Sequence, residues 1–290
     1  MNYLYRYVCL NDNTATRLIK QLSFYVVKAR VKLLPYAYGL NRKQRDIRII
    51  VSMTSYPKRF KTIIMPLKSL LLQSVKPDRI IVWLGSDSSE EMLTQEMKEL
   101  KKYGVEYRFD SKRNLKPHKK YYYALQEFPD DLVITVDDDI IYPRGLIESL
   151  LEAHLKYPKA VCARRVHKVY YRDGKPLPYR QWGFEYRKEC APSDELMATN
   201  GAGTLFPPHA LDQRAFISKD IEKYCLNADD IWLWFMEQLK GTLTVWVPCL
   251  LVHPPVVGES RNSGGLAQTN VESNGNDMYL KKLYEVYKDK

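Results

Sequence analysis

Cysteines spaced to bind a metal or to form a disulfide framework are absent from this sequence of 290 residues. The five cysteines are widely spread and odd in number, without CxxC or Cys/His spacing: Cys9, Cys162, Cys190, Cys225 and Cys249. This usage argues against a zinc site and a disulfide framework, and it is typical of reduced thiols in the cytoplasm. We therefore expect a cytoplasmic protein.

The sequence also lacks an apolar run long enough to cross a membrane. The best candidate, residues 22–40, is interrupted by Lys28, Arg30, Lys32 and Pro35. A spanning helix needs about 20 consecutive apolar residues. The same stretch lacks the compact apolar core and small-residue cleavage site of a signal peptide. We expect neither a transmembrane helix nor a signal peptide.

Motifs that mark two common classes of nucleotide enzyme are missing as well. The sequence contains no GxGxxG and no GxxxxGK[ST], and it has neither HExxH nor an internal repeat. A dinucleotide dehydrogenase or a P-loop enzyme is therefore disfavoured.

Acidic residues are scarce in the first 50 positions. Only Asp12 and Asp46 stand there against ten Lys and Arg, which accounts for +8 of the net charge of +11. The remaining 240 residues carry only +3. The basic character belongs to the N-terminal segment, so we do not expect a nucleic acid as partner of the whole protein.

Within that basic segment, residues 14–34 have the pattern of a helix that Pro35 ends. Five apolar residues fall roughly on one side with basic residues between them: Leu18, Leu22, Tyr25, Val26 and Leu33. A basic amphipathic helix of this kind lies on anionic membrane surfaces. We expect peripheral contact with the inner face of a membrane through residues 14–34. The alternative is a helix packed on the rest of the protein with its basic face in solvent.

Downstream, apolar strands and periodic helices alternate. Strands are expected at 46–54, 79–85, 105–109 and 132–136, and helices at 60–73, 88–103 and within 114–128. This alternation predicts a doubly wound, mixed but mostly parallel sheet flanked by helices. Further elements are expected as a helix at 144–156, strands at 160–169 and 204–208, a helix from 227 and a strand at 243–252. The expected organisation is a basic helical extension (1–45), a catalytic domain (46–255), and a mobile loop over 258–276 with a terminal helix (256–290).

Three consecutive carboxylates, Asp137, Asp138 and Asp139, follow the buried strand at 132–136. Ligands of open α/β sheets bind at the carboxyl ends of strands. Adjacent carboxylates repel one another unless a cation or basic groups compensate. Alternation along an extended chain places Asp137 and Asp139 on one face, where they could hold a hard divalent cation together with a diphosphate. The alternative is a solvated acidic turn.

The order of four features resembles a GT-A-fold glycosyltransferase of the bacterial surface-polysaccharide type. These features are the strand–helix alternation, the Asp triplet, the Gly-rich turn at 200–203 and the acidic pair Asp229-Asp230 at a helix start. The resemblance covers about residues 47–255. It implies a nucleotide-sugar donor, with a UDP-sugar favoured, and Mn²⁺ or Mg²⁺ as cofactor. It also implies a glycan or lipid-linked glycan acceptor in the synthesis of a capsule or lipopolysaccharide.

The resemblance further implies the residues of the site. Asp137 and Asp139 match the family's Asp-x-Asp motif as metal ligands, and His253 matches the position of a third ligand. Asp230 is favoured as the general base of an inverting reaction, with Asp229 beside it. The donor-binding residues would be Thr54, Ser55, Tyr56, Arg59, Lys116, Lys119, Lys120, Asp137, Asp138, Asn200, Gly201, Ala202 and Gly203.

Each of these groups also has a structural interpretation. Residues 54–59 suit nucleobase edges and phosphate but also form an ordinary strand-to-helix loop. The lysines could neutralise a diphosphate or be a solvated charge run, and the glycines could admit a ligand or only a turn. Asp229 and Asp230 suit a helix cap, and a lone His is often structural. Two other function classes stay open: a sugar nucleotidyltransferase or phosphatase using the Asp cluster, and a non-catalytic glycan-binding protein.

Overall fold

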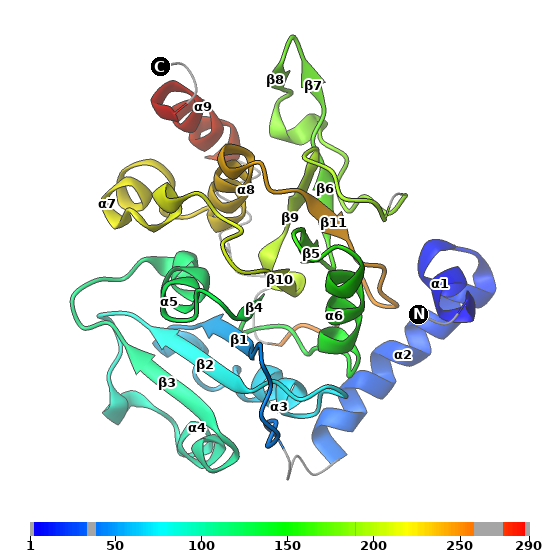
Figure 1. Ribbon diagram of the computed structural model, residues 1–290. Coiled ribbons are helices and arrows are strands. Elements are labelled where there is room, and N and C mark those ends of the chain that lie inside the picture. The colour runs from blue at the N-terminus through cyan, green and yellow to red at the C-terminus, as the bar shows by residue number, and fades with distance from the viewer. Residues whose placement is uncertain (1–2, 34–38, 189, 258–274, 288–290) are drawn as a thin grey trace.

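The computed structural model describes residues 3–33, 39–188, 190–257 and 275–287 (Figure 1). The loop expected at 258–276 falls almost wholly outside these residues, and its last two positions begin helix α9 (Gly275–Tyr287). Within the described residues, no helix is long and apolar enough to cross a membrane.

The centre of the molecule is one sheet of seven strands in the order β11-β5-β10-β4-β1-β2-β3. Its strands are β1 Ile49–Thr54, β2 Arg79–Leu84, β3 Val105–Phe109, β4 Leu132–Val136, β5 Val161–Ala163, β10 Thr204–Phe206 and β11 Thr244–Trp246. Only β10 is antiparallel to its neighbours β4 and β5, and the other pairs are parallel. The expected mixed, mostly parallel sheet is confirmed.

The central strands β1, β2 and β4 are mostly apolar because helices cover both faces of the sheet. Alternate side chains of β1 point to opposite faces of the sheet. Val51 and Met53 pack in one core cluster, whereas Ile50 packs in another together with Ala124. On the first side the helices are α3 Ile64–Leu71, α4 Gln95–Leu100 and α6 Leu146–Lys156, and on the second side they are α5 Lys119–Glu127 and α8 Asp229–Lys240.

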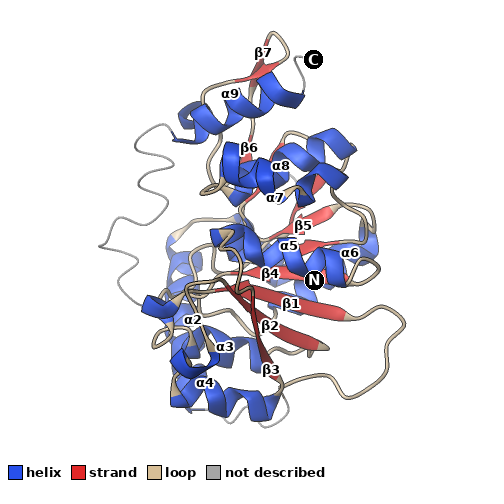
Figure 2. Ribbon diagram, turned by 90° about the vertical axis from the view of Figure 1, so that its left-hand side faces the viewer, coloured by secondary structure: helices blue, strands red, loops and turns tan. Residues whose placement is uncertain are grey.

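A second core lies around α8. The hairpin of β7 Tyr171–Arg172 and β8 Lys175–Pro176 and the short helix α7 Ser218–Asp220 contribute no buried residue to this core. The paired strands β6 Val166–Lys168 and β9 Leu196–Ala198 both contribute to it. The terminal helix α9 packs there through Leu280 and Leu283, both buried. Figure 2 shows α9 at the end of the molecule opposite α3 and α4.

Several expected elements are shorter or broken. The helix expected at 88–103 is a 3-10 turn at 90–92, then α4, then a 3-10 turn at 101–103. Thr94 causes the first break, because its hydroxyl caps the Met97 N–H and makes Gln95 the first helical residue. The strand expected at 160–169 divides into β5 and β6, since the later part pairs with β9 in a separate sheet. The late strand spans only 244–246.

The N-terminal extension forms α1 Tyr3–Leu10 and α2 Thr14–Leu33. Asn13 caps α2 by accepting the Thr16 N–H at 3.0 Å. Near its end, α2 packs Val31 against Leu72 and Ile141. The expected apolar side is largely in solvent, because the five residues on which it rests are 57–80% exposed: Leu18, Leu22, Tyr25, Val26 and Leu33.

Candidate functional site

The direction of β10 determines how the site is assembled. Thr204 at the start of β10 pairs with Thr135 near the end of β4. The turn that precedes β10 therefore lies at the carboxyl end of β4, beside the Asp triplet. A Cβ atom on Gly201 would lie 1.8 Å from Asp137 Oδ2, so this position must be glycine for the two segments to approach as they do.

Lys120 joins the triplet to the acidic pair of α8. Its Nζ lies 2.7 Å from Asp137 Oδ1 and 3.0 Å from Asp229 Oδ2, and its side chain is only 3% exposed. Burial alone would lower the pKa of Lys120, but the charges of Asp137 and Asp229 outweigh burial and raise that pKa well above its usual value. Lys120 is therefore a buried cation between two acidic clusters that the sequence places about 90 positions apart.

Asp230 is directed to the Gly-rich turn. Its Oδ1 accepts the backbone N–H of Asn200 at 2.9 Å and the side-chain N–H of Asn200 at 2.8 Å. Burial raises the pKa of Asp230 to about 6, with a further contribution from Asp229, while Lys120 and Asn200 act in the opposite direction. The Asn200 Oδ1 atom is buried and receives no hydrogen bond from the described residues.

Arg59 holds the other two acids of the triplet. Its Nη1 lies 2.7 Å from both Asp138 Oδ1 and Asp139 Oδ2, and Ser55 donates to Asp138 Oδ2 at 2.5 Å. The expected alternation, with Asp137 and Asp139 on one face and Asp138 on the other, does not hold. The strand ends at Val136 and residues 138–139 form a turn, so Asp138 and Asp139 share one guanidinium.

Asp137 and Asp139 nevertheless stay close enough to interact. Burial raises the pKa of Asp139, and the Asp137 charge raises it further. The expected third ligand is not with them: the His253 side chain is 67% exposed, and its Nε2 lies 3.0 Å from Glu185 Oε1. Across the described ranges, no group of three or more His, Cys, Asp or Glu is arranged to hold a metal ion. The ligand set of Asp137, Asp139 and His253 is therefore not brought together.

The remaining residues of the expected nucleotide loop have local partners. Thr54 donates its hydroxyl to the Trp83 carbonyl at 2.9 Å. The Tyr56 ring is 41% exposed and lies 5.7 Å from the Arg59 guanidinium carbon. In the Gly-rich turn, Ala202 is buried, and Gly203 has φ +103° with Leu146 closely packed against it.

The three lysines of residues 116–120 have different environments. Lys116 is exposed and donates to Asn227 Oδ1 at 3.0 Å. Lys119 is buried and donates to Asn114 Oδ1 at 2.5 Å, and burial lowers its pKa to about 8. The carboxylates of Asp87, Asp138 and Asp110 act on Lys119 in the opposite direction. Lys119 and Lys120 are thus directed into the site, whereas Lys116 is at its margin.

Two groups of residues at this edge were not predicted. Tyr142 accepts the Asp137 N–H at 2.7 Å and donates to the Gly201 carbonyl. A pocket of about 250 Å³ at the ends of β2 and β3 includes Trp83, Tyr123 and Asp110. The Trp83 and Tyr123 rings stack at 5.0 Å, and Tyr123 donates to Asp110 at 2.5 Å. Asp110 could have been found, because it directly follows an expected strand as Asp137 does.

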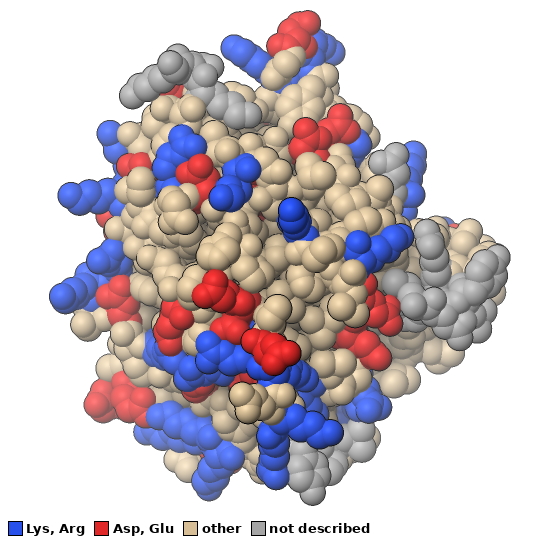
Figure 3. All heavy atoms as spheres, viewed as in Figure 1, with Lys and Arg blue, Asp and Glu red and all other residues tan. Residues whose placement is uncertain are grey.

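Charges of both signs adjoin one another at the molecular surface as well. On the face drawn in Figure 3, acidic side chains gather near the middle beside a group of Lys and Arg side chains. The acidic clusters of this protein are accompanied by basic groups, as the buried Lys120 and the half-buried Arg59 illustrate.

No curated protein sequence matches the chain. Among solved structures, it is similar to the mannosyltransferase PcManGT from Pyrobaculum calidifontis in complex with GDP-Man and Mn²⁺. The TM-score is 0.51 at 13% identity, over 97% of this chain and 76% of that one. A weaker likeness, with a TM-score of 0.46 at 11% identity, is to GalNAc-T7 with UDP, GalNAc and Mn²⁺, over 83% of this chain and 52% of that one.

The sequence match is to a family rather than to a single protein. A model of glycosyl transferase family 2 matches residues 51–211, which is more than half of the chain and includes the triplet and the Gly-rich turn. The alternatives of a nucleotidyltransferase, a phosphatase or a non-catalytic glycan-binding protein are therefore set aside. The chain belongs to glycosyl transferase family 2 and is a glycosyltransferase with a GT-A-like fold.

Proposed function

We propose that the protein transfers a sugar from a nucleotide-sugar donor to a glycan or lipid-linked glycan acceptor, with Mn²⁺ or Mg²⁺ as cofactor. The observation that carries this proposal is the position of Lys120 between Asp137 and Asp229. One buried cation brings the donor-side carboxylates and the acceptor-side carboxylates into a single site, as a transfer between two substrates requires.

The carboxylates suit a divalent cation that is completed by its substrate. Mg²⁺ is usually held by one or two protein carboxylates together with substrate phosphates and water. Asp137 and Asp139 supply two hard oxygen ligands, and their mutual repulsion would be relieved by a cation. We propose these two residues as the ligands, without His253. The bound cation would supply Lewis-acid stabilisation of the departing diphosphate.

The residues around the Gly-rich turn suit the transfer itself. We propose that Asp230 removes the proton of the acceptor hydroxyl while that oxygen attacks the anomeric carbon and the bond to the diphosphate breaks. A general base works best with a pKa near the working pH, and the Asp230 pKa of about 6 meets that condition. The buried Asn200 Oδ1, which lacks a donor among the described residues, is available to a sugar hydroxyl. This mechanism gives inversion at the anomeric carbon.

The nucleotide is assigned to the other side of the site. We propose that the nucleobase lies in the pocket of Trp83, Tyr123 and Asp110, where a ring can stack and a carboxylate can accept a base N–H. Lys119 and Arg59 are cations that could contact a diphosphate reaching from this pocket to Asp139, since Lys119 is affected by the charges of Asp110 and Asp138 and Arg59 pairs with Asp139. The solved mannosyltransferase with this fold carries GDP-Man, so GDP belongs in the test beside the favoured UDP.

The broader setting is also a proposal. The expected product is a bacterial surface polysaccharide such as a capsule or lipopolysaccharide, made at the inner face of the membrane. The exposed apolar side chains and basic residues of α2 support peripheral contact with anionic lipid. We retain the division into residues 1–45, 46–255 and 256–290, with α9 packed on the middle segment.

The test is calorimetric titration of the whole protein with UDP and GDP, with and without Mn²⁺. We expect one of them to bind with Mn²⁺ and to bind at least ten-fold less tightly in Asp139→Ala, while Asp130→Ala is unchanged. Asp130 is a suitable control because its side chain is 86% exposed and, among the residues that the structure describes, its ion-pair partner is the exposed His209. Metal-independent binding that Asp139→Ala leaves intact would contradict the metal assignment. Failure of UDP, GDP, CDP and dTDP alike would contradict the donor site.

A further inference from the structure

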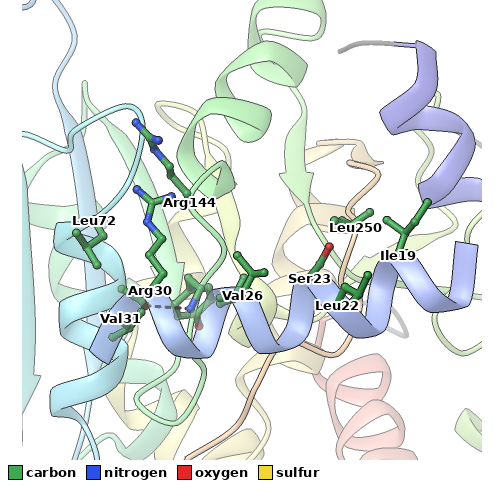
Figure 4. A pocket seen from close by; sticks show the side chains of 12 residues that line it. Ile19, Leu22, Ser23, Val26, Arg30, Val31, Leu72, Arg144 and Leu250 are labelled. Carbon is green, nitrogen blue, oxygen red and sulfur yellow. Dashed lines mark hydrogen bonds between the residues drawn. The ribbon is translucent and has the colours of Figure 1, made fainter. Parts of the chain in front are cut away.

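A groove separates α2 from the catalytic domain, and Tyr142 is a residue that it shares with the site described above. It has a volume of about 350 Å³ and a predominantly aliphatic lining (Figure 4). Ile19, Leu22 and Val26 of α2 form one wall, and Leu72 and Leu250 belong to the other. A volume of this size is within the usual range of small-ligand sites, about 300–1,000 Å³.

One end of this groove is positively charged. The guanidinium groups of Arg30 and Arg144 lie side by side there (Figure 4). No carboxylate of the described residues forms a salt bridge with either arginine, and the buried Arg30 Nε has no hydrogen-bond partner among them. Burial lowers the pKa of Arg30, and the charge of Arg144 lowers it further. The pKa of Lys76 is also lowered, by burial and by the charges of Arg144 and Arg30.

This arrangement is costly without a ligand. A buried polar atom that lacks a partner loses its hydration without compensation. Three cations close together also repel one another. An anion at this end of the groove would satisfy the Arg30 Nε and neutralise the repulsion. A phosphate suits it because arginine binds phosphate oxygens through two parallel N–H groups.

The rest of the groove requires an apolar ligand. Its aliphatic walls offer no charge to a soluble anion such as a nucleotide. The groove also opens onto the exposed side of α2, where Val26 is 62% exposed although it lines the groove. A hydrocarbon chain can therefore enter from that side and replace water along Ile19, Leu22 and Leu250.

We propose that this groove binds one molecule of a lipid phosphate, with a hydrocarbon chain between α2 and the catalytic domain and the phosphate on Arg30 and Arg144. The site differs from a general attraction of a basic helix to a membrane, since it takes a single molecule and requires both an apolar tail and an anionic head. It does not depend on the transfer reaction proposed above.

The test uses monomeric dodecyl phosphate below its critical micelle concentration, titrated into the whole protein without nucleotide. We expect saturable binding of one molecule. Inorganic phosphate lacks the tail and dodecyl maltoside lacks the charge, so each should bind at least ten-fold more weakly. Equal binding of inorganic phosphate would overturn the proposal in favour of an anion site, and equal binding of the maltoside would overturn it in favour of an apolar surface.

Variants of α2 and the loop before α6 identify the site. Arg30→Gln combined with Arg144→Gln should weaken dodecyl phosphate binding by about ten-fold or more, because it removes charge-assisted hydrogen bonds. Lys28→Gln, which removes an exposed charge of α2 outside the groove, should leave binding unchanged. Ser23→Phe, which fills the groove with an aromatic ring, should abolish binding.

Circular dichroism of each variant shows whether it is folded. If Lys28→Gln weakens dodecyl phosphate binding as much as the double variant does, the effect is one of general charge, and the proposed site is wrong. Undiminished binding in folded Ser23→Phe would do the same. The same variants are also titrated with UDP or GDP. Because they leave the donor-site residues unchanged, nucleotide binding tests the donor site separately from the groove.

Discussion

Asp230 accepts two hydrogen bonds from one residue, the backbone N–H and the side-chain N–H of Asn200. This double contact fixes the Asp230 carboxylate against the Gly-rich turn while leaving its second oxygen free of those bonds. We predict that Asp230→Asn lowers the rate of sugar transfer by about 10²- to 10⁴-fold, the usual contribution of a general base. Nucleotide binding should change little. The measurement is kcat beside calorimetric nucleotide affinity, with Asp130→Asn as control.

The acidity of Asp230 gives the reaction a pH dependence. The base must be ionised, so the rate should rise with pH through about 6 and level off above it, since burial raises the Asp230 pKa to that value. The measurement is kcat from pH 5 to 8 with a saturating donor. A rate that is constant between pH 5 and 7 would contradict the assignment of Asp230 as base.

Lys119 and Lys120 are adjacent buried lysines whose pKa values are shifted in opposite directions. Lys120→Met should destabilise the protein by about 3–5 kcal/mol, because it leaves Asp137 and Asp229 without their buried partner. Lys119→Met should cost much less, because Lys119 donates to a neutral amide and burial lowers its pKa to about 8. Urea unfolding at pH 7 measures the free energy of unfolding of both variants. Similar losses in the two variants would show that Lys120 is not the central cation.

Gly201 limits how far Asp137 can move. In Gly201→Ala the new Cβ would lie 1.8 Å from Asp137 Oδ2, so the carboxylate must shift. A displacement of about 1 Å in a catalytic site can lower the rate on the order of 100-fold. We expect that loss together with weaker Mn²⁺-dependent nucleotide binding. Gly145→Ala is the control, since its nearest neighbour would be 3.9 Å away. Unchanged Mn²⁺ dependence in Gly201→Ala would contradict the role of Asp137.

Glu237 provides a test of stability that does not depend on measuring activity. Burial raises its pKa to about 8, Thr244 donates to its Oε2 at 2.8 Å, and its Oε1 has no partner among the described residues. The unfolded chain ionises Glu237 near pH 4.5 and the folded chain only near 8. The wild type should therefore lose stability between these values. Glu237→Gln should be more stable by on the order of a few kcal/mol at pH 8 but not at pH 4.5. The control is the exposed Glu222→Gln, which should have little effect at either pH.

The fold could be predicted from local patterns because its central strands are short, mostly apolar runs between polar segments. Residues 132–136 are buried in full, and the strand at 105–109 was expected with its observed bounds. Element ends were less accurate where a side chain intervened, as Thr94 does at the start of α4. Polarity patterns contain no information on such single hydrogen bonds.

The site was predicted as separate groups, and their assembly was not. The positions of Asp137 and Asp229 followed from a strand end and a helix start. Their common contact with Lys120 depends on how α5 and α8 are arranged on the same face of the sheet. The pairing of Asp138 with Arg59 depends on a turn that begins where the strand stops. His253 was expected as a third ligand from the family resemblance, yet its partner is Glu185 from a distant loop.

Tyr142 has a consequence beyond its hydrogen bonds. Its hydroxyl connects the Asp137 N–H to the Gly201 carbonyl, and the same residue lines the groove beneath α2. A molecule in the groove that displaces Tyr142 would alter the geometry on which the nucleotide depends. The two occupancies would then be linked thermodynamically. If the ligand in the groove changes the affinity for the nucleotide by some factor, the nucleotide must change the affinity for that ligand by the same factor.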